Sequence, residues 1–251
     1  MFFGFKLEPY DNFKTREPEQ YKLHLNIQEF LKHKVRLYFK RELPALCDTS
    51  SLGIPVLPAD YTNVIKPYTI NSKEEFLNRD IDLFTAFGKI LQEIEAFGHN
   101  MFTSEKQHDI EIINNKRKQA ILLIHNEWFE RTELDKYTNN TKTMLDLYGS
   151  GMKCFRNIES SSNTVSFKQD PNVLIHTYPW TDGFNCVTLP NKQTNLLDVD
   201  ASCSKILEYL RGDKQELLYD IYLNSTETNS KYEIKKYIKD HVIHNIKLHL
   251  K

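Results

Sequence analysis

The chain has 251 residues, and its 33 Lys and Arg residues nearly balance its 34 Asp and Glu residues, giving a net charge of −1. This balance excludes a protein whose whole surface is basic and binds polyanions in general. A hydrophobic content of 40% excludes a mostly disordered chain. A chain of this length also buries a core without needing a disulfide or a metal.

Residue usage within this total is skewed towards residues with A/T-rich codons. The chain has 25 Lys against 8 Arg, and only 6 Ala and 8 Gly. This composition indicates an A/T-rich genome, such as that of a virus or another A/T-rich genetic element.

The cysteines and the N-terminus indicate where the protein is found. Cys47, Cys154, Cys186 and Cys203 form no CxxC pair, so we expect reduced core cysteines and no metal site. The N-terminus lacks the pattern of a signal peptide, and the longest dense apolar run, residues 120–124, is too short to span a bilayer. We therefore expect a cytoplasmic protein with no membrane contact.

The first half of the chain reads as helical. Apolar residues recur every three or four positions over residues 18–43, 72–97 and 104–134, and the Pro-rich residues 44–70 separate the first two runs. Ser72 and Glu75 have the spacing of a capping box. The short connection between the second and third runs favours an antiparallel helix hairpin, and residues 141–148 could add a short helix.

The second half reads as mixed. Ser160–Asn163 resembles a linker, and strand-like runs follow at residues 164–167, 172–176 and 184–189, separated by turn signals. Helical patterns return at residues 201–211 and 232–250. We therefore predict a predominantly helical α+β fold, with a helical domain over residues 1–158. A mixed interaction domain over residues 163–251 would hold a small antiparallel sheet and helices.

Residues 196–212 combine a short apolar strand end, two aspartates and an amphipathic helix. The residues that carry this pattern are Asp198, Asp200, Ile206, Leu207, Tyr209, Leu210 and Arg211. The pattern resembles the channel-tetramerisation form of the BTB/POZ fold, although Cys203 stands where that family usually has phenylalanine. The resemblance implies an oligomerisation or adaptor module without catalysis, with Asp198, Asp200, Tyr209 and Arg211 in the interaction unit. Any short strand followed by an amphipathic helix would give a similar pattern.

Basic residues form two clusters that could contact nucleic acid. The first is Lys32, Lys34, Arg36, Lys40 and Arg41, with aromatic residues between them, and the second is Lys116, Arg117 and Lys118. Basic side chains bind phosphates and aromatic rings stack on bases. The alternative is a solvated helix end, which also favours positive charge.

No catalytic motif stands out in the sequence. It has no P-loop, no GxSxG and no glycine-rich dinucleotide turn, which disfavours nucleotide-dependent enzymes that use those loops. His241 falls on the apolar stripe of the last helix and is expected to be a hydrogen-bonded core residue. We assign no catalytic residue, metal or cofactor.

These observations favour a non-enzymatic protein–protein interaction or assembly protein, such as a viral adaptor, that associates with itself or with a protein partner. One alternative is a nucleic-acid-processing enzyme of the metal-independent nuclease type that uses the basic helix. Another is a structural virion component.

Overall fold

The structure is a computed structural model that describes residues 35–40, 43, 45, 49–50, 53–63, 68, 70–86, 122–125, 131–147, 156–169, 174–193 and 196–250. The statements below concern these residues.

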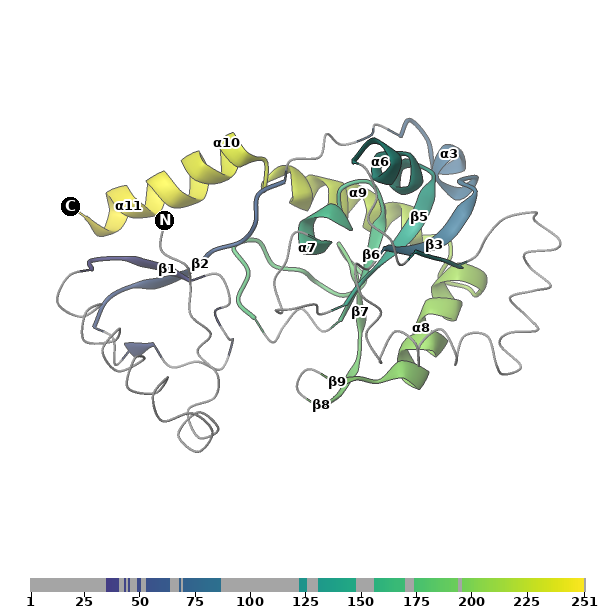
Figure 1. The fold of residues 1–251 in the computed structure, drawn as a ribbon, viewed down its shortest axis with the longest axis horizontal. Helices are drawn as coiled ribbons and strands as arrows, with labels where there is room; N and C mark the ends of the chain where they lie inside the picture. The colour runs from purple at the N-terminus through teal and green to yellow at the C-terminus, as the bar shows by residue number, and fades with distance from the viewer. Residues whose placement is uncertain are drawn as a thin grey trace.

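A parallel sheet of five strands forms the centre of the described structure (Figure 1). Its strands are β3 (Ile81–Ala86), β4 (Leu122–His125), β5 (Thr141–Asp146), β6 (Val165–Gln169) and β7 (Val187–Leu189). Their order across the sheet is β4-β3-β5-β6-β7, and every neighbouring pair is parallel. The chain therefore adds β4 on one side of β3 and then β5, β6 and β7 on the other.

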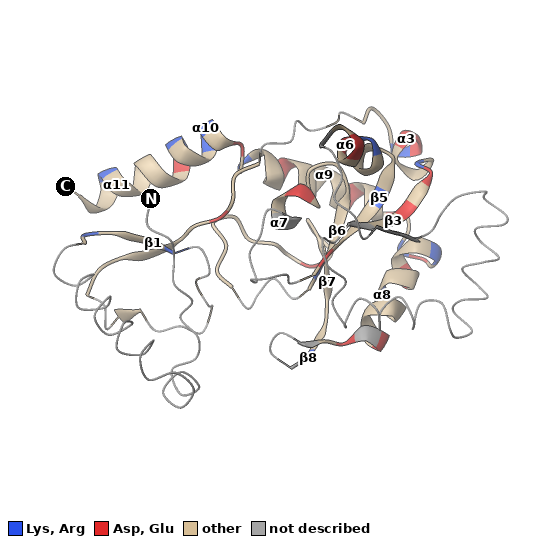
Figure 2. Ribbon diagram, in the orientation of Figure 1, with Lys and Arg blue, Asp and Glu red and all other residues tan. Residues whose placement is uncertain are grey.

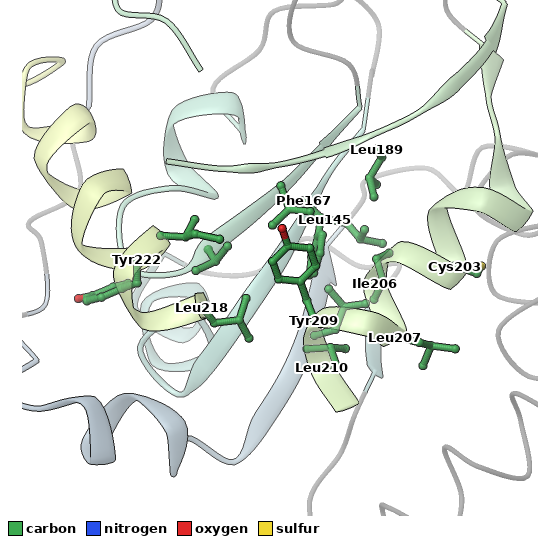
Figure 3. Packing of buried hydrophobic residues seen from close by; sticks show 14 of the residues in the cluster. Leu145, Phe167, Leu189, Cys203, Ile206, Leu207, Tyr209, Leu210, Leu218 and Tyr222 are labelled. Atoms are coloured by element: carbon green, nitrogen blue, oxygen red, sulfur yellow. The ribbon is translucent and has the colours of Figure 1, made fainter. Parts of the chain in front are cut away.

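Apolar side chains cover both faces of this sheet, because successive residues of a strand point to opposite faces. On one face Leu83, Leu145 and Phe167 pack against α8 (Val199–Arg211) and α9 (Leu217–Ser230). Figure 3 shows this packing, with side chains of both helices directed at the strands. On the other face Phe84 and Met144 pack against α6 (Arg131–Asn139).

Shorter elements surround the sheet. They are α3 (Lys73–Leu77), α7 (Arg156–Glu159), the parallel pair β1 (Tyr38–Lys40) and β2 (Val56–Pro58), and the antiparallel pair β8 (Asn191–Gln193) and β9 (Leu196–Leu197). The chain ends in α10 (Ile234–Tyr237), the π-helical segment η3 (Ile238–Ile243) and α11 (His244–His249). We call these three the C-terminal helix, which lies beside β1 and β2 in Figure 1.

The predicted predominantly helical α+β fold is wrong. The strands β3, β4 and β5 lie within residues 72–97, 104–134 and 141–148, where helices were expected, and the strand β1 lies within residues 18–43, which were also expected to be helical. The expected antiparallel sheet is also wrong, because β6 and β7 pair in parallel. The proposed helix hairpin falls largely outside the described residues.

Several local signals are confirmed in the structure. The helices expected at residues 201–211 and 232–250 are present as α8 and the C-terminal helix. Ser72 caps α3 by accepting a hydrogen bond from the Glu75 backbone N–H at 3.1 Å. Cys186 and Cys203 are free and buried, as expected, whereas Cys47 and Cys154 lie outside the described residues.

The expected linker at Ser160–Asn163 is a buried connection between α7 and β6. Ser161 and Ser162 donate hydrogen bonds from their hydroxyls to the Ile158 carbonyl, both at 3.0 Å. The division into domains at this point stays a prediction. Across the described ranges, the helices are too short or too polar to cross a membrane.

Candidate functional site

The strand order creates a reversal point between β3 and β5. β3 has β4 on one side and β5 on the other, so the connections that leave the carboxyl ends of β3 and β5 run in opposite directions. In doubly wound sheets, ligands bind in the crevice outside the carboxyl ends of the strands at such a point. The segments that follow these two strands, residues 87–121 and 148–155, lie outside the described residues.

A buried ion pair lies at the carboxyl ends of β5 and β6. Asp146 and Lys168 are register partners, and the Lys168 Nζ is 2.5 Å from the Asp146 Oδ2. The same Nζ lies 4.2 Å from the centroid of the Trp180 ring. Both charges are removed from water, which costs free energy that their mutual attraction only partly offsets. Such a pair stabilises the fold little relative to apolar residues, and its place at the carboxyl ends of the strands makes it a candidate functional position.

Two amide side chains continue this edge of the sheet. Gln169 ends β6, Asn191 follows the end of β7, and the Gln169 Nε2 donates to the Asn191 Oδ1 at 2.9 Å. The Asn191 Nδ2 is buried, and the described residues offer it no hydrogen-bond acceptor. Leaving a buried donor without a hydrogen bond costs about 1–3 kcal/mol of stability, unless a ligand or a water molecule accepts that hydrogen bond. The carboxyl edge therefore has a hydrogen-bond donor that a ligand could use.

Cys186 lies next to this pair but is not a nucleophile. Burial raises the pKa of its thiol to about 12, and the nearby Lys168 ammonium only partly opposes this shift. A thiol with this pKa stays protonated at neutral pH, whereas nucleophilic attack needs the thiolate.

A second polar group joins β2, residues 176–178 and the C-terminal helix. The Asp60 Oδ1 lies 3.0 Å from the His176 Nδ1, and the Asp60 Oδ2 accepts the Thr177 backbone N–H at 2.6 Å. The Tyr237 hydroxyl accepts the Asp60 backbone N–H at 2.9 Å. Burial raises the pKa of Tyr237 to about 12, so its hydroxyl stays protonated. A histidine oriented by a carboxylate can exchange protons, which makes His176 a second candidate.

The amino ends of the strands hold charges with structural roles. Lys142 Nζ lies 2.5 Å from Asp82 Oδ1, and both side chains are buried. Arg79 donates from Nη1 to the backbone carbonyls of Thr141 and Asn163, both at 2.5 Å. These contacts tie β5 to the start of β6, at the edge opposite to the reversal point.

The predicted nucleic-acid-binding residues are only partly described. Arg36 is exposed, and Lys40 is buried in β1. The others, Lys32, Lys34, Arg41, Lys116, Arg117 and Lys118, lie outside the described residues. A nucleic-acid surface at these positions stays a prediction.

The predicted BTB/POZ unit is wrong. Asp198 caps α8 by accepting the Ala201 backbone N–H at 3.2 Å, and Asp200 lies in the first turn of that helix. Tyr209 is buried in the core against Phe167 of the parallel sheet, and Arg211 lies in the last turn of α8. These residues therefore attach a helix to a parallel sheet and do not form a BTB/POZ unit.

His241 confirms the expectation of a hydrogen-bonded core histidine. It is buried, and its Nε2 lies 2.8 Å from the Pro58 carbonyl oxygen. Five candidate residues were not predicted from the sequence: Asp146, Lys168, Asn191, Asp60 and His176. Asp146 directly follows the apolar pair Met144 and Leu145, and this was the one local signal of a strand's carboxyl end.

No protein-family model and no curated protein matches this chain. Among solved structures, the C-terminal domain of a group 1 family glycosyl transferase from Francisella tularensis is similar, at 13% identity and a TM-score of 0.43, covering 70% of this chain and 100% of that one. A second is Os79 from O. sativa, in complex with UDP and deoxynivalenol-3-glucoside, at 17% identity and a TM-score of 0.36. That match covers 65% of this chain and 40% of Os79.

The expectation of a non-enzymatic viral adaptor, assembly or virion protein is wrong. That expectation depended on a BTB/POZ unit with an antiparallel sheet, and the structure has a parallel sheet in its place.

Proposed function

We propose that this protein is an enzyme that binds a nucleotide at the carboxyl edge of its parallel sheet, outside the ends of β3 and β5. The observation that carries the proposal is the strand order, in which β3 is flanked by β4 and β5. This order creates the reversal point at which doubly wound sheets bind their ligands.

The side chains at this edge support a polar ligand. The buried Asn191 Nδ2 offers a donor, and the Asp146–Lys168 pair places charge at the ends of β5 and β6. From β5 to β7 is two strand spacings, about 10 Å, which a nucleotide can span. The lack of a glycine-rich loop means that side chains and strand-end backbone groups would hold the phosphates.

Sugar transfer from a UDP-sugar is the first reaction to assay. UDP is the nucleotide in the O. sativa structure, and the F. tularensis structure is named as a glycosyl transferase. The strand order carries the proposal, and these names only select the first probes.

Calorimetric titration with UDP, and with ADP as a second nucleotide, tests the proposal. Ala86→Asp adds a carboxylate at the carboxyl end of β3, where it would repel a phosphate. Asn78→Asp adds the same group at an exposed position before the amino end of β3. We expect the wild-type protein and Asn78→Asp to bind one nucleotide with similar affinity, and Ala86→Asp to bind it at least ten times more weakly.

Circular dichroism of both variants checks that they are folded. Binding of neither nucleotide by the wild-type protein would contradict the proposal. Equal binding by folded Ala86→Asp would also contradict it, because the ligand would then lie elsewhere.

A further inference from the structure

The C-terminal helix exposes a continuous stripe of apolar side chains. Its members are Ile234, Ile238, Ile243, Ile246 and Leu250, whose exposed fractions lie between 38% and 45%. Soluble proteins seldom expose large apolar side chains in a continuous row without a binding role. We call this row the apolar stripe.

A different face of the same helix attaches it to the rest of the molecule. Tyr237 and His241 are buried, and the His241 ring lies edge-on to Phe39 of β1 at 5.5 Å between centroids. Asn245 donates from its Nδ2 to the His241 carbonyl at 2.7 Å. In an α-helix, a row of residues spaced four apart winds slowly around the helix axis. The wider turn of the π-helical segment η3 winds the other way, so it keeps such a row on one face. The anchoring face and the apolar stripe therefore stay separate along the whole helix.

A row of lysines borders the apolar stripe. Lys235, Lys239 and Lys247 each follow a stripe isoleucine by one residue, and all three are exposed. Asp240 is the one acidic residue between positions 234 and 250. Figure 2 shows this distribution, with blue segments along α10 and α11 and one red segment between them.

The basic row beside the apolar stripe indicates which kind of partner the helix binds. A helix that lies in a membrane interface buries its apolar face at the acyl boundary and extends lysines to anionic headgroups. A second copy of this chain fits poorly, because an antiparallel two-fold interface through the stripe would bring the lysine rows of both copies together, and the second helix has no acidic row to pair with them. Each lysine near an anionic surface adds to the electrostatic attraction.

We propose that the C-terminal helix docks this protein on an anionic lipid surface, with the apolar stripe inserted and the lysine row at the headgroups. The helix lies on the surface without crossing the bilayer. This replaces the expectation from sequence that the protein makes no membrane contact, and it does not depend on nucleotide binding.

Co-sedimentation of the full chain with phosphatidylcholine vesicles, with and without phosphatidylglycerol, tests this proposal. Ile238→Ser/Ile246→Ser shortens the apolar stripe, and Lys235→Gln/Lys239→Gln removes charge beside it. The matched controls are Leu223→Ser, at an exposed leucine of α9, and Lys136→Gln/Lys192→Gln, at exposed lysines elsewhere. All these positions are exposed, so we expect every variant to fold, which circular dichroism checks.

We expect the wild-type protein and both controls to bind the anionic vesicles and to be released by salt. Each helix variant should bind at least ten times more weakly. Absence of binding to anionic vesicles, equal binding to neutral ones, or undiminished binding by the helix variants would overturn the proposal. A wild-type dimer in light scattering that Ile238→Ser/Ile246→Ser dissociates would also overturn it, because the stripe would then bind a second copy.

Discussion

Charged residues inside the sheet pair across neighbouring strands. Lys168 and Asp146 are both buried, and they are 22 residues apart in sequence. Lys142 and Asp82 form the same kind of pair at a separation of 60 residues. Local sequence gives no signal for either pair, because each forms only when distant segments become adjacent strands. The candidate site could not be predicted from the sequence for this reason.

Removing one member of the Asp146–Lys168 pair should lower the free energy of unfolding more than removing both. We expect Lys168→Met to lower the free energy of unfolding by about 3–5 kcal/mol, because it leaves the Asp146 carboxylate buried without its cation. The double variant Asp146→Asn/Lys168→Met removes that charge and should recover part of the loss. Urea denaturation of both variants measures the difference. An equal or larger loss in the double variant would show that the two side chains are not coupled.

At the scale of elements, the helix α8 and the strands β6 and β7 were predicted as such, whereas the segments that form β3, β4 and β5 were predicted as helices. α8 combines a capping aspartate with apolar residues at helical spacing, so its pattern is local. β3 reads Ile-Asp-Leu-Phe-Thr-Ala and β5 is buried along its whole length. A strand buried on both faces has no alternating pattern, so its short apolar run resembles part of a helix. For this reason the sequence predicts helices where the structure has β3 and β5.

The cap of α8 gives a prediction at this scale. Asp198→Ala removes the acceptor of the Ala201 backbone N–H and should lower the free energy of unfolding by about 1 kcal/mol. Asp198→Asn keeps an acceptor oxygen and should lose much less. Thermal or urea denaturation distinguishes them. If Asp198→Asn is as destabilised as Asp198→Ala, the side chain does not act as a cap.

At the scale of the whole molecule, the fold follows from which strands become neighbours. The composition correctly indicated a chain that forms a core, but the order β4-β3-β5-β6-β7 depends on pairings between segments far apart in the sequence. The reversal point and its polar edge are properties of that order. The sequence alone therefore did not predict the reversal point or its polar edge.

Buried groups that stay protonated make the whole molecule sensitive to alkaline pH. Burial raises the pKa of Cys186 from 9.0 to about 12 and that of Tyr237 from 10.0 to about 12. Above pH 9 the unfolded chain loses these protons while the folded protein keeps them, so the free energy of unfolding should fall as the pH rises towards 12. The limiting slope is about 1.4 kcal/mol per pH unit for each group.

Tyr237→Phe separates the contribution of one group. The variant should be less stable at neutral pH, because it loses the hydroxyl that accepts the Asp60 backbone N–H. Its stability should then fall less steeply than that of the wild-type protein above pH 10. Urea midpoints measured from pH 7 to pH 11 give both slopes. Identical slopes would contradict a raised pKa at Tyr237.

Hydrogen exchange of the full chain with and without saturating UDP, followed by mass spectrometry, tests whether a nucleotide binds at the carboxyl edge of the parallel sheet, at the β3–β5 reversal point. We predict slower exchange in peptides that contain the carboxyl ends of β3 and β5, residues 84–86 and 144–147. Peptides at the opposite edge, residues 78–81 and 139–141, should be unchanged. Slower exchange at the amino edge alone, or no change in any peptide, would contradict nucleotide binding at the carboxyl edge.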